Sequence, residues 1–167
     1  MLGTAYSGGW HKTDKAGRPI YIERTGKINV RQYVAVSKRL ARPGEEISAP
    51  TMRAHIHTNE IGHIIMRKTN VDREAAGLAP VHQCTIIMDC SGLGLGHLYH
   101  PALGVLRASA THDQNYYPEG MSRLLLVNAP PMVRVAWAMI KVWLDGPLQR
   151  KVQFIKPADT VARLLQE

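Results

Sequence analysis

Residues 85–97 read TIIMDCSGLGLGH, an apolar and β-branched run that ends in an acidic residue and three glycines spaced two apart. Such a run is typical of a strand buried on both faces, and the glycines indicate a turn. A dinucleotide fingerprint requires G-x-G-x-x-G, with an acidic residue closing a second strand about 20 positions later. Here the third glycine comes one position early and that acidic residue is missing, so we interpret the segment as a strand-to-helix turn.

The segments on either side extend this pattern. Gln83 to Asp89 and Leu124 to Val127 are almost continuous apolar runs, which predict buried strands. Between them Tyr99, Leu103, Leu106 and Ala110 recur at helical spacing. We also expect strands at 18–24, near a sheet edge because of Pro19, and at 151–155, with helices near 31–40, 51–68, 132–144 and 158–166. Helical crossovers join parallel strands, so the expected fold is α/β, with helices covering a mostly parallel sheet.

The totals limit the class of protein. A chain of 167 residues fits one domain over its whole length, and its net charge of +8 favours anionic partners. Nucleic acid is not expected, because Lys and Arg are scattered and no zinc-finger spacing occurs. No segment has the apolar core of a signal peptide or the length of a membrane span. The sequence therefore predicts a soluble protein.

Three groups of residues invite a chemical role. Cys84 and Cys90 lie six positions apart on one extended segment and should not bridge each other, which fits a reducing cytoplasm. The histidines at 55, 57 and 63 do not share a helix face, so surface positions are expected rather than a metal site. Asp89, Ser91 and His97 are the residue types of a hydrolytic triad, but they lack the G-x-S-x-G elbow, and we expect no enzyme.

Residues 132–144, MVRVAWAMIKVWL, are apolar around most of a helix, since the two charged residues, Arg134 and Lys141, lie on one line. The segment would cover only about 20 Å, too short for a hydrocarbon core of about 30 Å. It is either a central core helix or a lid that covers an apolar ligand and touches a membrane with its other side.

Five ordered blocks carry a family resemblance: GWHKTDKAGRPIYIE at 9–23, IMDCSGLG at 87–94, QNYYPE at 114–119, NAP at 128–130 and WLD at 143–145. Together they resemble the CRAL-TRIO lipid-binding domain, and more narrowly the Sec-fourteen type of phosphatidylinositol transfer protein, over residues 8 to 156. The resemblance implies a sheet that forms the floor of an apolar lipid pocket and a helix that acts as its movable gate.

The resemblance also implies roles for individual residues. Glu119 and Lys151 would hold an inositol headgroup, because a carboxylate accepts hydrogen bonds from hydroxyls and an ammonium neutralises a phosphodiester. The gate helix and the pocket next to it would include Val133, Trp137, Ile140, Trp143 and Leu144. The pocket floor would include Tyr21, Ile86, Met88, Leu125 and Val127.

The sequence departs from the family pattern in several places. Leu148 stands where the family has a threonine, which puts inositol specificity in question. Cys84 and Ile86 occupy the positions of the choline-site serine and threonine, and Thr85 is one residue off, which turns it to the other face of the strand. The helical N-terminal bundle and the usual C-terminal end of the family are not recognisable, so the chain could be part of a larger protein.

We therefore expect a cytoplasmic lipid carrier that contacts anionic membranes transiently, needs no cofactor or metal, and exchanges or presents one phospholipid, phosphatidylinositol above all. Two alternatives stay open. The ligand could be a neutral hydrophobe, such as a sterol, tocopherol or retinoid, which would not need Glu119 or Lys151. The domain could also serve as a regulatory module for protein interactions.

Overall fold

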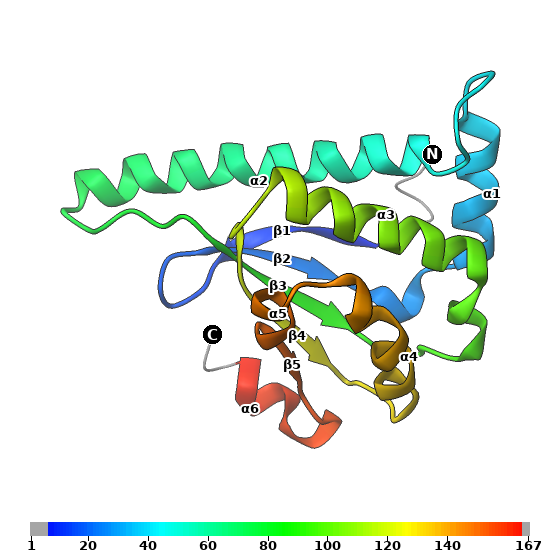
Figure 1. Ribbon diagram of the computed structural model, residues 1–167. Helices are drawn as coiled ribbons and strands as arrows, with labels where there is room; N and C mark the ends of the chain where they lie inside the picture. Colours follow the sequence, from blue (N-terminus) through cyan, green and yellow to red (C-terminus); the bar gives the residue numbers. More distant parts are fainter. Residues whose placement is uncertain (1–6, 165–167) are drawn as a thin grey trace.

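The computed structural model describes residues 7–164 and contains a five-stranded sheet in the order β1-β2-β3-β4-β5 (Figure 1). β1 pairs antiparallel with β2, and the next three pairs are all parallel. The strands are β1 (Gly8–Thr13), β2 (Pro19–Glu23), β3 (Cys84–Asp89), β4 (Met121–Val127) and β5 (Val152–Phe154). The expected α/β fold with a mostly parallel sheet is confirmed.

Helices connect these strands. The α-helices are α1 (Val30–Leu40), α2 (Ala49–Ala75), α3 (His100–Tyr116), α4 (Met132–Ile140), α5 (Gly146–Arg150) and α6 (Thr160–Leu164). Short 3-10 helices are η2 (Thr25–Lys27), η3 (Leu95–Leu98), η4 (Lys141–Trp143) and η5 (Pro157–Asp159). The helix expected at 51–68 extends to Ala75, and the end of the one expected at 158–166 lies outside the described residues. Within residues 7–164, no helix has both the length and the hydropathy that crossing a membrane requires.

The strand predicted at 18–24, near a sheet edge, is present as β2, but it is not the first strand. β1 precedes it and takes the edge, so β2 lies between β1 and β3. Sequence patterns miss β1 because all but one of its residues are exposed, which leaves no apolar alternation to detect. Its exception, Trp10, donates from its indole nitrogen to the carbonyl of Thr58 in α2 at 3.0 Å.

The two faces of the sheet are packed differently. One face, which we call the far face, carries Ile87, Leu125 and Val127, exposed by only 7%, 0% and 2%, and packs against Leu164 of α6. The opposite face, which we call the helix face, carries Leu126 and packs against α4. At the edge of the helix face, Trp10 of β1 packs on Tyr21 and connects this face to α2. The helix face therefore faces residues 132–144, which we call the gate segment.

A buried carboxylate fixes the turn between β1 and β2. Asp14 Oδ1 accepts hydrogen bonds from the backbone of Ala16 and Arg18, both at 2.9 Å. Its Oδ2 accepts from Arg18 Nε at 2.9 Å and from Thr85 Oγ1 at 2.8 Å. Burial by itself would raise the pKa of Asp14, but the hydrogen bonds and the Arg18 charge hold it below its usual value. These contacts explain why Asp14 and Arg18 occur together in the first sequence block.

Both cysteines are buried free thiols, as expected from their spacing. Burial raises the pKa of Cys84 to about 11 and that of Cys90 to about 12. A thiol with so high a pKa is almost wholly protonated near neutral pH, so neither cysteine is poised as a nucleophile.

Candidate functional site

The two predicted headgroup residues meet in space. Lys151 Nζ donates to Glu119 Oε2 at 2.6 Å, and the two side chains are 20% and 71% exposed. Glu119 lies two residues before the start of β4, and Lys151 immediately precedes β5. The pair therefore lies at the edge of the sheet where two neighbouring parallel strands begin.

The local backbone holds Glu119 in place. It has a φ of +57°, a conformation uncommon for a residue other than glycine. Its carbonyl accepts from Gln83 Nε2 at 3.0 Å, and the amide of Gly120 donates to the carbonyl of Tyr117 at 3.2 Å. The Y-P-E-G turn is thus fixed on both sides of the carboxylate.

Lys151 follows directly from α5. Its amide donates to the carbonyl of Leu148 at 3.1 Å, and its own carbonyl accepts from Leu124 in β4 at 2.9 Å. Asp145 begins α5 by accepting from the amide of Leu148 at 2.7 Å. Leu148, where the family has a threonine, therefore lies one helical turn before the ammonium group and offers no side-chain hydrogen bond there.

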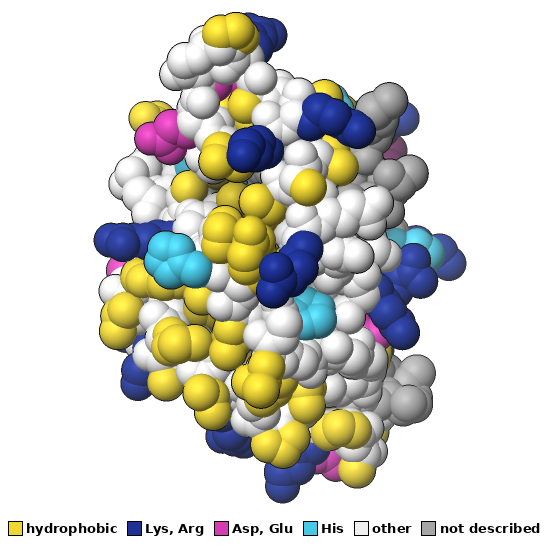
Figure 2. All heavy atoms as spheres, turned by 90° about the vertical axis from the view of Figure 1, so that its right-hand side faces the viewer, with side chains coloured by type: hydrophobic (Ala, Val, Ile, Leu, Met, Phe, Trp, Pro, Cys, Tyr) yellow, Lys and Arg dark blue, Asp and Glu magenta, His cyan; other side chains and the backbone are white. Residues whose placement is uncertain are grey.

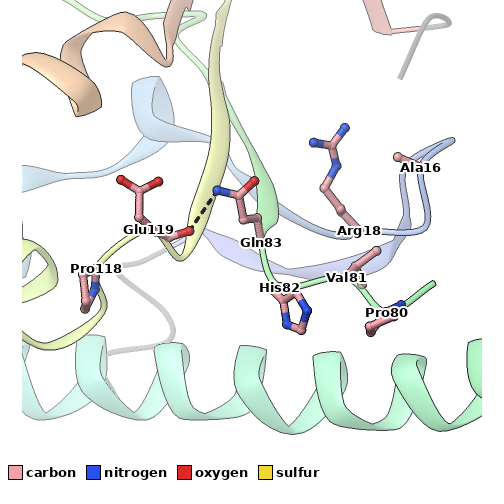
Figure 3. Close-up of a pocket in the computed structure, with 8 residues that line it drawn as sticks. All are labelled: Ala16, Arg18, Pro80, Val81, His82, Gln83, Pro118 and Glu119. Atoms are coloured by element: carbon pink, nitrogen blue, oxygen red, sulfur yellow. Dashed lines mark hydrogen bonds between the residues drawn. The ribbon is translucent and has the colours of Figure 1, made fainter.

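A cavity of about 570 Å³ borders Glu119. It lies where β2, β3 and β4 begin, and its polar lining includes Arg18, His82 and Gln83 (Figure 3). In Figure 3 the imidazole of His82 points toward α2, whereas the side chains of Arg18 and Glu119 point away from it. The Glu119 carboxylate thus borders open space on one side and the Lys151 ammonium on the other.

The predicted pocket-floor residues do not all share a face. Strand pairing puts Tyr21, Ile86 and Met88 in register across β2 and β3, with Ile86 and Met88 opposite Leu124 and Leu126 of β4. These side chains belong to the helix face. Leu125 and Val127 point to the far face, so their assignment to the same floor is wrong. Leu124 and Leu126 are the β4 residues that lie on the helix face.

The helix face is not sealed. Ile86, Met88 and Leu124 are only half-buried although they lie on β3 and β4, each of which has a neighbouring strand on both sides. The equivalent far-face positions Ile87 and Leu125 are almost inaccessible, at 7% and 0%. A sheet face with accessible apolar side chains beneath helices is suited to receive an apolar ligand.

The gate segment is shorter than expected as an α-helix. α4 ends at Ile140, and η4 continues to Trp143, so Leu144 lies just beyond it in extended backbone. Val133 is buried against Leu126, and the Trp137 ring packs on Phe154 of β5 with centroids 5.7 Å apart. Ile140, Trp143 and Leu144 are half-buried.

The outer side of the gate segment is apolar too. Val135, Met139 and Val142 are 61%, 41% and 72% exposed. They recur at steps of three and four, so they form one stripe. A central core helix would have no such stripe, and the lid interpretation agrees with the observed exposure.

Both ends of the gate segment are fixed by side chains. Before α4, Asn128 Nδ2 donates to Asp89 Oδ1 at 3.0 Å, and Asn128 has a φ of +51°. After η4, Gln114 Nε2 donates to the carbonyl of Trp143 at 3.0 Å, and its Oε1 accepts from the amide of Asp145 at 2.9 Å. Sequence reasoning missed Gln114, although it opens the QNYYPE block.

The histidines and the triad residues have other partners. His55 Nε2 lies 2.7 Å from Asp113 Oδ1 in α3, so His55 is not simply a surface residue, and His97 Nδ1 accepts from the amide of Gly94 at 3.1 Å. Ser91 donates to Asp89 at 2.6 Å. No relay joins Asp89, Ser91 and His97 through these bonds, and among residues 7–164 no three His, Cys, Asp or Glu side chains are grouped as metal ligands.

Comparison with protein-family models matches residues 4–167 to the CRAL/TRIO domain. The chain is 32% identical over 157 residues to phosphatidylinositol/phosphatidylcholine transfer protein SFH11 of Arabidopsis thaliana, covering 91% of the chain and 37% of that protein. It is 29% identical over 158 residues to SEC14 cytosolic factor of Candida glabrata, covering 95% of the chain and 48% of that protein. The chain thus spans less than half the length of these relatives.

A solved structure supports the fold. The crystal structure of Sfh5 matches 97% of this chain and 50% of its own with a TM-score of 0.70, at 14% identity. Likeness at that level of identity concerns the fold alone, and it agrees with the sheet and helices described above. The chain therefore belongs to the CRAL-TRIO family, as a domain of the Sec-fourteen type.

Proposed function

We propose that the chain binds one phospholipid, phosphatidylinositol, and exchanges it between membranes or presents it. The acyl chains lie between the helix face and α4, and the headgroup lies at Glu119 and Lys151. One observation carries the proposal: two residues that are 32 positions apart in the chain form an ion pair at the edge of the sheet. The relative named as a phosphatidylinositol/phosphatidylcholine transfer protein supports the phospholipid class.

The chemistry of the pair suits this headgroup. The Lys151 ammonium neutralises the phosphodiester, and the Glu119 carboxylate accepts hydrogen bonds from inositol hydroxyls. The lipid must first separate the two side chains, which costs little because an exposed ion pair contributes at most about 1 kcal/mol. No bond of the lipid is broken, so the proposal includes neither an enzyme activity nor a cofactor.

Apolar burial drives loading but not selectivity. Each CH₂ moved out of water contributes about 0.8 kcal/mol, and this gain largely cancels when the lipid moves from one bilayer to another. Headgroup contacts then decide which lipid is chosen. We propose that the protein works in the cytoplasm, in transient contact with anionic membranes, as the name of the cytosolic relative supports.

The test is lipid loading from mixed liposomes that contain phosphatidylinositol and phosphatidylcholine. The protein is re-isolated, and native mass spectrometry identifies the bound lipid. Lys151→Ala should lower the bound phosphatidylinositol about tenfold or more, because a charge-assisted contact is lost. Lys68→Ala, which removes an exposed cation from α2, should load like the wild type.

Each outcome is informative. Equal loading of both variants would exclude Lys151 as a headgroup ligand. If the protein loads phosphatidylcholine alone, the proposed lipid pocket stands, but its proposed specificity for phosphatidylinositol is wrong. A folded protein that carries no lipid would instead favour the scaffold function in protein interactions.

Leu148 favours a second candidate. It replaces the hydroxyl of the family threonine one turn before Lys151, so this part of the site is less polar than in relatives with that threonine. A neutral hydrophobe, such as a sterol, tocopherol or retinoid, would need neither charge of the pair. Its signature is a neutral ligand whose loading is unchanged in both Glu119→Gln and Lys151→Ala.

A further inference from the structure

Three long segments contain no acidic residue: 25–44, 90–112 and 120–144. All 13 Asp and Glu residues of the chain lie outside them. The first segment forms η2 and α1, the second forms the glycine-rich loop and most of α3, and the third includes α4 and η4. In Figure 1, α1, α4 and the beginning of α3 lie together on the right-hand side of the molecule.

Figure 2 shows this side directly. Hydrophobic side chains gather over much of its lower half and along its centre, with Lys and Arg side chains among them, while acidic side chains stay toward its outline. The outer stripe of α4, with Val135 and Met139, belongs to the acid-free segments, as do the exposed Arg134 and Lys141. A surface that is both apolar and cationic matches the chemistry of an anionic lipid bilayer.

The most exposed large hydrophobic side chain in the described chain lies in the glycine-rich loop. Leu95 is 79% exposed, more than any other large apolar residue between 7 and 164. It begins η3 and lies between Gly94 and Gly96. An apolar side chain of this size that is so little covered by the rest of the protein is available for an external partner.

The loop around Leu95 is held in shape rather than free. Gly26 of η2 packs so tightly on the backbone of Ser91 that a Cβ atom there would clash. Gly92 has a φ of +88°, and the amide of Leu93 donates to the carbonyl of Cys90 at 3.0 Å. The base of the loop is thus fixed against η2, and Leu95 points outward from a rigid turn.

Cations surround this turn. η2 ends with the exposed Lys27, and the Arg31 guanidinium lies 4.8 Å from the centre of the Tyr99 ring. The structure therefore combines a protruding leucine with positive charge on neighbouring elements.

We infer that the 91–98 loop is a fixed membrane anchor. Leu95 inserts at the acyl boundary of an anionic bilayer, Lys27 and Arg31 lie at the lipid phosphates, and the anchor brings the outer stripe of α4 to the same surface. The anchor stays rigid while α4 moves, so the protein remains docked when the lipid site opens. The role of this anchor rests on the proposed lipid exchange, but its test does not require the protein to carry a lipid.

The experiment measures sedimentation of the protein with vesicles of phosphatidylcholine mixed with phosphatidylserine. Leu95→Ser should bind roughly five- to tenfold more weakly, since one leucine side chain no longer enters the bilayer. Val71→Ser is the matched control, because Val71 is 65% exposed in the last turns of α2, at the left end of Figure 1. It should bind like the wild type, and binding of both proteins should fall with added salt.

A second measurement reports insertion itself. In Leu95→Cys the new thiol can be labelled with an environment-sensitive dye, because both natural cysteines are buried. A blue shift with anionic vesicles, absent with phosphatidylcholine alone, is expected. No shift, together with unchanged binding of Leu95→Ser, would overturn the inference, and so would a loss of binding in Val135→Ser alone, which would make the gate the sole contact.

The two proposals fail separately. If no lipid is loaded in the liposome assay but vesicle binding still depends on Leu95, the anchor stands and the exchange function falls. If lipid is loaded but vesicle binding does not depend on Leu95, the exchange function stands and the anchor falls. If Leu95→Ser binds vesicles normally but no longer retains a protein partner, the anchor inference is likewise overturned.

Discussion

Lys151 Nζ lies 2.6 Å from Glu119 Oε2, although the whole gate segment separates these residues in the chain. In the absence of a ligand, each group neutralises the other. If these two residues hold the headgroup, as we propose, the site is assembled before lipid arrives, and its charges become available when the pair opens. Because Glu119 is 71% exposed, water can take over its hydrogen bonds during that opening.

We first predict that the pair contributes little to folding. Glu119→Gln should change the free energy of unfolding by no more than about 1 kcal/mol, because the pair is solvent-exposed. Urea denaturation followed by circular dichroism measures this, with Glu45→Gln as a matched control, since Glu45 pairs with Arg53 at 2.8 Å on the surface. A loss of several kcal/mol in Glu119→Gln alone would mean that the pair is structural rather than a ligand site.

Asp14 should behave in the opposite way. Its side chain is 1% exposed, and it joins Arg18 and Thr85. Asp14→Ala should destabilise the fold by about 3–5 kcal/mol, because it leaves the Thr85 hydroxyl, two backbone amides and the half-buried Arg18 guanidinium without their acceptor. Thr85→Val should cost about 1–3 kcal/mol, since one buried acceptor loses a hydrogen bond. Urea midpoints that stay near the wild-type value in both variants would contradict this assignment.

The lowered pKa of Asp14 predicts a dependence of stability on pH. A carboxyl whose folded-state pKa lies below its unfolded value, about 3.9, stabilises the protein fully above that value. The contribution is lost as the pH falls through the folded-state pKa. Below about pH 4 the unfolding free energy of the wild type should therefore fall more steeply than that of Asp14→Asn. The unfolding free energy is measured by urea titrations at a series of pH values. If it falls equally steeply in the two proteins, Asp14 is not the source of the pH dependence.

The thiols should react slowly. Burial raises the pKa of Cys84 to about 11 and that of Cys90 to about 12, so little thiolate exists at pH 8. Ellman's reagent should label neither thiol rapidly in the native protein and both in denaturant. Rapid native labelling of one thiol would show that the helix face opens on the timescale of the assay.

Gln114 should limit motion at the end of the gate segment. Gln114→Leu removes the bonds to the Trp143 carbonyl and the Asp145 amide, so hydrogen exchange at Asp145 and its neighbours should accelerate. The variant should lose about 1–3 kcal/mol of stability. Gln32→Leu on α1, an exposed position, should leave exchange in this region unchanged. Equal hydrogen-exchange rates at Asp145 in the two variants would show that Gln114 does not restrain the end of the gate segment.

The sequence predicts more of the secondary structure than of the site geometry. Strands β3 and β4 and helices α1 and α3 fall where apolar periodicity indicates, because burial imposes that periodicity. β1 escaped prediction because an exposed edge strand shows no such pattern. The assignment of Glu119 and Lys151 to a headgroup site rests on the family resemblance, whereas Gln114 and the His55–Asp113 contact join elements whose distance in space no local pattern encodes.

By itself, the sequence determined the α/β order, the gate segment and the two residues that form the ion pair. The tertiary structure alone decided the face on which each apolar side chain of β4 lies, since a continuous apolar run carries no alternation and only pairing with β3 sets its register. For that reason Leu124 and Leu126, rather than Leu125 and Val127, face the gate. Folding likewise brought α1, α4 and the beginning of α3, which belong to three acid-free segments, to one side of the molecule, a relation between distant elements that arises only when the helices pack around the sheet.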